Sequence, residues 1–278
     1  MSKIVRIALE EDIGPGDITS RACVPEDRRA RGTYIAREPL VLAGTEVLAE
    51  IFDRVALLKR DGDLCQPGEP IATVDGNARS LLERERVSLN FLQRLSGVAT
   101  LARKFADAVD GTACRVLDTR KTTPGMRVLE KRAAAAGGVT NHRMGLFDAI
   151  LIKNNHIIAA GGVEAAMRAA LTATYQSAPT ATHLVGKALP IEIEVRSLAE
   201  LHEALAAGAT HVLLDNLTPA EAAVWIREIA GRVTVELSGG ITLENVRAYA
   251  ETGADFVSAG AITHSARAVD ISFRLELL

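Results

Sequence analysis

The sequence predicts an α/β protein built from two parts, a small module of mixed helices and strands followed by a short (β/α) barrel. Three observations predict this class. The sequence pattern of the 278-residue chain changes near residue 110, from turns rich in glycine and proline to a regular alternation of segments. Beyond that point short apolar runs alternate with amphipathic segments, and nearly every run ends in polar residues. The predicted domains are therefore residues 1–110, which include the bridging helix, and residues 111–278, whose last residues are expected to pack back on the N-terminal domain.

The first part combines turns rich in glycine and proline with short β-like runs. Turns such as DIGPGDIT and CQPGEP separate runs such as GTYIA and IATV, which is typical of a small α+β module. A helix is expected over residues 80–109, where apolar residues recur at helical spacing. This helix would bridge the two parts, and Ser96 and Gly97 mark a potential break in it.

From Cys114 onward the chain repeats a β-then-α pattern. Helical segments such as LAELHEALAAG follow β-rich runs, which are in order RVLDT, DAILIK, PIEIEV, HVLLDN, TVELSGG and DFVSAGA. Such repeats predict parallel strands covered by helices. Only six or seven units fit into this part of the chain, fewer than the eight of a standard barrel. A short barrel and an open doubly wound sheet are the alternatives.

The polar strand ends favour the barrel. Closing the sheet would bring these ends to one mouth, where barrel enzymes place their chemistry. In PIEIEV, the alternation of side chains places Glu192 and Glu194 on one face, where buried charges need partners. The polar residues at the strand ends are Asp118, Thr119, Arg120, Lys121, Lys153, Asn154, Glu194, Asp215, Asn216, Ser238 and Ser258.

Charge and composition exclude several classes of protein. The formal net charge is -3 and aromatic residues make up 4% of the chain, which does not fit a nucleic-acid binder. We expect neither secretion nor membrane insertion, and the three widely spaced cysteines fit a reducing, cytoplasmic setting. Between Arg115 and His156, however, eight Lys or Arg face three acidic residues. A cationic island in an acidic chain suggests an anionic small molecule.

Two adjacent cations follow the first barrel strand, in DTRKTTPGMR. Because side chains alternate along extended backbone, Arg120 and Lys121 would point to different parts of the mouth. A guanidinium suits bidentate binding of a carboxylate, whereas an ammonium serves as a point charge for phosphate. The two histidines His142 and His156 do not indicate zinc, since no carboxylate stands at ligand spacing. Later segments add the candidates His142, Arg143 and Lys153.

Two loops of small residues follow the last two strands. S-G-G at 238–240 and S-A-G-A at 258–261 would let backbone N–H groups approach a phosphate, at the position where barrels commonly bind one. Glu194 and Asp215 end neighbouring strands, and this pair suits Mg2+ or sugar hydroxyls better than glycosidase chemistry, because cations crowd the same mouth. The residues therefore describe a site for a phosphorylated sugar and a carboxylated anion.

An ordered set of motifs runs through nearly the whole chain. It comprises EEDIGPGDIT, LLERERVSLNFLQRLSG, DTRKTTPGMRVLEKRAAAAGG, NHRMGLFDAILIKNNHI, IEIEV, HVLLDN, ELSGGI and VSAGAITHS. This set resembles the quinolinate phosphoribosyltransferase family. The resemblance implies a type II phosphoribosyltransferase fold, with an N-terminal α/β sandwich and a C-terminal (β/α) barrel. It also implies a homodimer, or a higher oligomer, whose sites are completed across the interface. The implied reaction joins quinolinate to 5-phosphoribosyl 1-diphosphate with Mg2+, and it gives nicotinate mononucleotide, diphosphate and CO2 for NAD biosynthesis.

The resemblance also implies roles for individual residues. Arg86 would enter the site from the partner subunit, and Lys121 would bind diphosphate or phosphate oxygens. Glu194 and Asp215 would hold the ribose and the metal, and together with Lys121 and Lys153 they form the implied catalytic set. The residues implied to line the quinolinate pocket are Arg120, His142, Arg143 and Lys153. Further substrate contacts are expected at Thr119, Ser238, Gly239, Gly240, Ser258, Gly260 and His264.

Three other hypotheses fit parts of the pattern. A phosphoribosyltransferase for a mono-acid such as nicotinate would need fewer cations and would release no CO2. A Schiff-base aldolase could use Lys153, because lysines at barrel strand ends do this chemistry. A sugar-phosphate sensor would bind phosphoribosyl diphosphate without releasing diphosphate. The chain also departs from the family pattern at Asn154, where the family usually has Asp, and at Leu237, where it usually has a small residue.

Overall fold

The computed structural model describes residues 1–177 and 189–278. The chain forms two compact units, which are considered separately. The first unit consists of Met1–Lys104, Lys121–Val139 and Ile262–Leu278, and the second of Phe105–Arg120 and Thr140–Ala261. The first unit includes two segments beyond residue 110 that pack with the N-terminal residues. One supplies a strand to the N-terminal sheet, and the other packs its Gly137 against the backbone at Ala99 and Arg103.

The first unit is built on an antiparallel sheet of four strands in the order β12-β1-β5-β3. On β1 the side chains alternate between exposed and buried, and the buried Tyr34 packs edge-on against Phe273 of β12 with ring centroids 5.0 Å apart. A Cβ atom at Gly32 would lie 1.9 Å from the same Phe273 ring, so a larger residue there would have to displace the ring. The four strands are β1 (Arg29–Ala36), β3 (Val55–Leu57), β5 (Pro70–Asn77) and β12 (Ile271–Leu277), and β2 (Leu40–Val41) pairs separately with β4 (Leu64–Cys65).

Helix α4 (Ala78–Ala108) confirms the long helix predicted from the apolar spacing, but the break expected at Ser96 and Gly97 is wrong. Both residues serve packing instead. The Ser96 hydroxyl accepts a hydrogen bond from the backbone N–H of Ala43, and a Cβ atom at Gly97 would lie 2.0 Å from the carbonyl oxygen of Arg267. The remaining helices of this part of the chain are α1 (Lys3–Ile13), α2 (Ile18–Cys23), α3 (Thr45–Ile51), α5 (Arg127–Ala136) and the short α11 (Ala261–His264).

The second unit contains a parallel sheet of six strands in the order β6-β11-β10-β9-β8-β7. Neighbours are consecutive in sequence except that the first strand pairs with the last, which is the cyclic order of a barrel opened between β6 and β7. A doubly wound sheet would reverse its strand order at an internal point, so that alternative is wrong. The strands are β6 (Arg115–Leu117), β7 (Ile150–Ile152), β8 (Ile191–Val195), β9 (His211–Asp215), β10 (Thr234–Ser238) and β11 (Phe256–Ser258).

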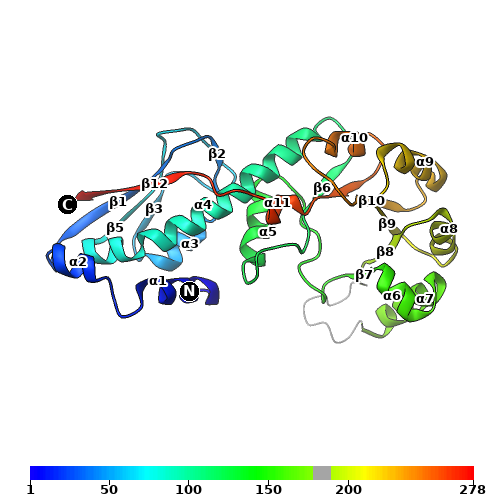
Figure 1. Ribbon diagram of the computed structural model, residues 1–278, viewed down its shortest axis with the longest axis horizontal. Coiled ribbons are helices and arrows are strands. Elements are labelled where there is room, and N and C mark those ends of the chain that lie inside the picture. Colours follow the sequence, from blue (N-terminus) through cyan, green and yellow to red (C-terminus); the bar gives the residue numbers. More distant parts are fainter. Residues whose placement is uncertain (178–188) are drawn as a thin grey trace. The chain divides into compact units, whose positions relative to one another are not determined.

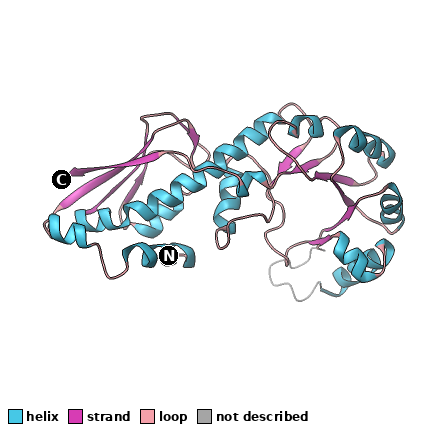
Figure 2. Ribbon diagram, in the orientation of Figure 1, coloured by secondary structure: helices cyan, strands magenta, loops and turns pink. Residues whose placement is uncertain are grey.

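Helices follow these strands and cover the outside of the curved sheet (Figures 1 and 2). Their ends follow local chemistry: Ser197 caps α8 by accepting the N–H of Glu200, and Thr218 and Glu221 form a capping box at the start of α9. Within the described ranges no helix combines the length and the apolar character needed to cross a membrane. The helices are α6 (Asn154–Ala160), α7 (Val163–Ser177), α8 (Leu198–Ala206), α9 (Pro219–Ile229) and α10 (Val246–Ala250).

Candidate active site

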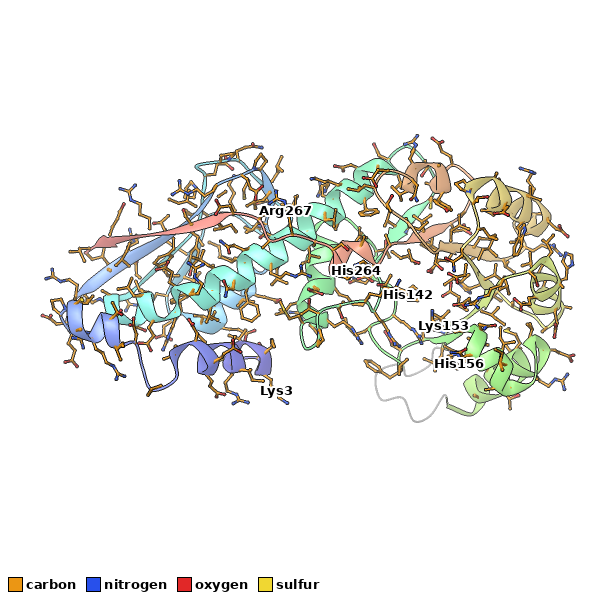
Figure 3. All side chains as sticks on the ribbon, viewed as in Figure 1. Lys3, His142, Lys153, His156, His264 and Arg267 are labelled. Atoms are coloured by element: carbon orange, nitrogen blue, oxygen red, sulfur yellow. The ribbon has the colours of Figure 1, made fainter. Side chains whose placement is uncertain are left out.

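The candidate site of the second unit lies at the carboxyl ends of its parallel strands. Because the strands are parallel and in register, their last residues reach the same edge of the sheet. Figure 3 labels His142 and Lys153 in this unit. The residues that the strands deliver here include Asp118, Thr119 and Arg120 after β6, Lys153 after β7, Glu194 in β8, Asp215 in β9, Ser238 in β10 and Ser258 in β11.

Glu194 and Asp215 are brought together, as the sequence predicts, and one cation joins them. The Glu194 side chain is buried, and its two oxygens pair with Lys153 Nζ at 3.3 Å and with a guanidinium nitrogen of Arg196 at 2.9 Å. The same nitrogen lies 3.8 Å from Asp215 Oδ2. Ser238 donates its hydroxyl to Asp215 Oδ1 at 2.7 Å, which fixes the second carboxylate. Sequence analysis missed Arg196, although it stands directly after the β8 strand.

This pair of carboxylates fits a divalent cation. Oxygens of Glu194 and Asp215 converge on a single positive centre, which the Arg196 guanidinium supplies here. Mg2+ prefers hard oxygen ligands, and it typically takes one or two carboxylates and completes its shell with water and substrate phosphates. The carboxylate oxygens of Glu194 and Asp215 are therefore of the kind that could hold Mg2+.

A second cluster forms where His142 meets two further acids. Its Nε2 lies 3.3 Å from Glu192 Oε2 and 3.3 Å from Glu236 Oε2. No carboxylate stands at ligand spacing from His142 in the sequence, but β8 and β10 bring two acids to it in the fold. The alternation rule applied to TVELS would have placed Glu236 on the face of Ser238, so a signal for it existed.

The hydrogen bonds of His142 favour a proton over a metal ion in this cluster. Its Nδ1 accepts the backbone N–H of Arg143 at 2.7 Å, so the proton of the neutral ring lies on Nε2, between the carboxylates. A metal-binding histidine instead donates from its other ring nitrogen. Burial opposes a charged ring, but the hydrogen bonds to Glu192 and Glu236 outweigh it and raise the pKa of His142 to about 9. A pKa of about 9 favours a protonated His142 between the two acids, and a protonated ring does not bind a metal ion.

Arg143 and Arg120 bring two like charges close together. Burial lowers the pKa of Arg143, and the neighbouring charge of Arg120 lowers it further. Buried Asp118 holds the two chain segments together, since it accepts hydrogen bonds from Asn141 Nδ2 at 2.7 Å and from the backbone N–H of His142 at 2.8 Å. The nearby carboxylates of Asp148 and Glu192 offset part of this repulsion at Arg143.

The two loops of small residues differ in how closely a helix follows them. Gly239 has a φ of 96°, and a Cβ atom there would lie 2.2 Å from Asn216 Oδ1, so only glycine fits. Gly240 has a φ of 62°. A helix does not directly follow this loop, because Asn245 closes a turn by donating to the carbonyl of Gly240, and α10 begins only after it. The second loop runs directly from Gly260 into α11.

Three predicted site residues belong to the first unit. Arg86 lies on α4 with an exposed side chain, and within the described residues it has no hydrogen-bonded or ion-paired partner. The carbonyl oxygen of Lys121 accepts the hydroxyl of Thr263 at 2.8 Å. His264 is exposed and its Nδ1 lies 2.6 Å from the Ser265 hydroxyl. His156 is not a ligand in this arrangement, since its Nδ1 accepts the backbone N–H of Lys153 and caps α6.

Comparison with known proteins gives a consistent result over the whole chain. Residues 17–96 match the N-terminal domain and residues 98–274 the C-terminal domain of quinolinate phosphoribosyl transferase. The chain is 44% identical over 283 residues to a carboxylating nicotinate-nucleotide pyrophosphorylase of Mycobacterium leprae, covering 98% of this chain and 95% of that protein. It is 39% identical to a probable enzyme of the same name from Bacillus subtilis, covering 100% and 94%. The solved nicotinate-nucleotide pyrophosphorylase of Francisella tularensis superposes with a TM-score of 0.90 at 37% identity, covering 99% and 95%.

Proposed function

The chain belongs to the quinolinate phosphoribosyl transferase family, and from that premise we propose that it converts quinolinate and 5-phosphoribosyl 1-diphosphate into nicotinate mononucleotide, diphosphate and CO2. One observation of the second unit carries the proposal. The guanidiniums of Arg120 and Arg143, which repel each other, occur in the same unit as the carboxylates of buried Glu194 and half-buried Asp215. The dicarboxylate acid would bind to the guanidiniums, and the ribose of the phosphorylated sugar, with Mg2+, would lie at the carboxylates.

The acid substrate is assigned to the cationic group of residues. Arg120 and Arg143 would each bind a carboxylate of quinolinate, because a guanidinium fork matches a carboxylate. His142, held by Glu192 and Glu236, lies beside Arg143 in the chain and would line the same pocket. Lys153 would contact the substrate from the end of β7. In this arrangement the ring nitrogen of quinolinate, which is the nucleophile, is oriented by its two carboxylates.

The sugar phosphate is assigned to the carboxylates and the loops of small residues. Glu194 and Asp215 would face the ribose and, with Mg2+, the diphosphate. Lys121 would bind diphosphate oxygens, a role that rests on the resemblance to the family. The residues proposed for the phosphate side are Thr119, Ser238, Gly239, Gly240, Ser258, Gly260 and His264.

The proposed reaction has two steps, transfer of the ribose to the quinolinate nitrogen and then loss of CO2. The bond from C1 of the ribose to the diphosphate oxygen breaks as the quinolinate nitrogen bonds to C1, and positive charge develops on the sugar. Glu194 and Asp215 stabilise that charge. Mg2+, when bound, supplies neutralising charge for the leaving diphosphate. The pyridinium then accepts the electron pair of the C2–carboxylate bond, CO2 departs, and a proton takes its place on C2.

We also propose that the enzyme is a homodimer in which Arg86 acts on the partner's site. Arg86 is an exposed cation with no ion-paired partner within the described residues, although it lies in a helix segment of the type that usually forms surface salt bridges. A ligand or a second chain would supply the missing negative charge. Mixing an Arg86→Ala variant with an Arg120→Ala variant would restore part of the activity if one site per mixed dimer is intact. Activity no greater than the sum of the two variants would contradict the assignment.

The Schiff-base alternative is disfavoured by the pairing of Lys153. Its Nζ lies 3.3 Å from Glu194 Oε2, so this ion pair engages the nitrogen that would have to attack a carbonyl. The proposed reaction is tested by incubating the protein with phosphoribosyl diphosphate, Mg2+ and either quinolinate or nicotinate. We expect nicotinate mononucleotide from quinolinate. Product from nicotinate alone would favour the mono-acid alternative instead.

A further inference from the structure

An ion pair between a buried carboxylate and a partly exposed guanidinium in the first unit lies outside the proposed catalytic set. Glu130 of α5 is fully buried, and its Oε1 accepts two hydrogen bonds from the guanidinium of Arg94 on α4, at 2.8 Å and 3.1 Å. These residues are 36 positions apart in the chain. Burying a carboxylate costs free energy unless a cation pairs with it and hydrogen-bond donors satisfy its oxygens. The groups that contact the Glu130 carboxylate are therefore held in fixed positions.

The second oxygen of Glu130 fixes the loop that begins with Lys121. The backbone N–H of Thr123 donates to Oε2 at 3.0 Å, and the Thr123 hydroxyl donates to Oε1 at 2.8 Å. One carboxylate thus holds both polar groups of a residue two positions beyond Lys121.

The guanidinium of Arg94 also reaches the segment that contains His264. Its terminal nitrogens donate to the carbonyl oxygens of Thr263 and Ala266, on both sides of that histidine. The Thr263 hydroxyl in turn donates to the carbonyl oxygen of Lys121 at 2.8 Å. The two segments, far apart in sequence, are therefore tied to each other and to the same ion pair.

We propose that Arg94 and Glu130 are positioning residues, which hold the backbones of Lys121 and His264 in the geometry needed to bind phosphate groups. The proposal rests on the proposed function, because that function assigns diphosphate and phosphate oxygens to Lys121 and His264. Lysine has one point charge and no planar fork, so it could not replace the guanidinium at Glu130, Thr263 and Ala266 together. The pair acts on the phosphate substrate and leaves the acid substrate unaffected.

Three variants test this assignment. Thr263→Val preserves shape and removes the hydroxyl bond to Lys121, and Glu130→Gln keeps the size of the side chain but removes its charge. Arg132→Gln is the matched control, because Arg132 lies on the same helix and pairs with Glu46 in an exposed ion pair. Initial rates with either substrate varied give KM for each, thermal unfolding reports stability, and calorimetry with inorganic pyrophosphate measures binding directly.

We expect Thr263→Val to raise KM for phosphoribosyl diphosphate and Kd for pyrophosphate about 3- to 10-fold, the effect of one hydrogen bond. Glu130→Gln should raise both about 10- to 100-fold, because it weakens charged hydrogen bonds. KM for quinolinate should stay within about 2-fold in both variants, and Arg132→Gln should resemble the wild type, as for an exposed pair.

A purely structural role would lower the unfolding temperature without changing pyrophosphate binding by the folded protein, and that result would overturn the proposal. If Glu130→Gln fails to fold, Thr263→Val decides: an unchanged Kd and KM contradict the assignment. Wild-type protein that forms no nicotinate mononucleotide would refute the proposed function. The comparison of pyrophosphate binding would still test the positioning role.

Discussion

Replacing Glu194 with glutamine separates the structural role of this buried carboxylate from its chemical role. The substitution removes one negative charge and hardly changes the size of the side chain. Both cationic partners are half exposed, with side chains 51% and 50% accessible for Lys153 and Arg196. Solvent screens such pairs to about 0.2–1 kcal/mol each, and the neutral amide is less costly to bury. The net loss of stability should therefore be at most about 2 kcal/mol.

The expected effect on catalysis is larger. If Glu194 stabilises the positive charge on the sugar, removing its charge should lower kcat/KM by about 10²- to 10³-fold, or about 2.7–4 kcal/mol. At about 2–4 °C per kcal/mol, the unfolding temperature should fall by no more than about 8 °C. Steady-state rates of nicotinate mononucleotide formation and a thermal melt measure the two effects.

A control substitution shows whether any surface carboxylate would behave alike. Glu228→Gln in α9 removes the partner of His202, an exposed pair in the same unit, and should leave kcat/KM unchanged. A folded Glu194→Gln enzyme with kcat/KM within about 5-fold of wild type would refute the role assigned to this carboxylate.

Further predictions concern the acid pocket, the packing of α4 and the thiols. Arg120→Ala should lower kcat/KM for quinolinate by about 10²- to 10³-fold, because a buried carboxylate loses its partner, and steady-state kinetics with near-normal values would exclude that contact. Gly97→Ala should cost about 1–3 kcal/mol, since its Cβ would meet a backbone oxygen at 2.0 Å, and an unchanged melting temperature would contradict the packing. Burial raises the pKa of the Cys114 thiol to about 12 and also raises that of Cys65, whereas Cys23 is exposed. Both buried thiols stay protonated at pH 8, so a thiol reagent should modify one cysteine in the native protein and three after unfolding.

The arrangement of the second unit was predictable because its information is local. Each β-then-α repeat shows its period within a dozen residues, and parallel strands bring their ends to one edge without further information. The pairing of Glu194 with Asp215 follows from that rule. Local signals also misled: a Ser-Gly pair suggested a break at residues 96–97, where the glycine instead permits close packing inside a continuous helix.

Contacts between segments that are far apart in the chain could not be predicted from the sequence. Asp118 is visible as a polar strand end, but nothing local shows that it binds the segment 23 positions later. Arg94 and Glu130 read as ordinary charges on two amphipathic helices, because a helix period does not reveal which exposed-looking charge is buried by a neighbour. Such pairings depend on tertiary packing, and local sequence patterns do not show which distant segments pack together.

The most direct measurement uses quinolinate labelled in its 2-carboxylate, with phosphoribosyl diphosphate and Mg2+, and records labelled CO2 and nicotinate mononucleotide together. We expect one CO2 for each nucleotide, and no CO2 when phosphoribosyl diphosphate is omitted. Nucleotide formed without labelled CO2, or CO2 released without phosphoribosyl diphosphate, would contradict a transfer in which ribosylation of the ring nitrogen drives the loss of the carboxylate.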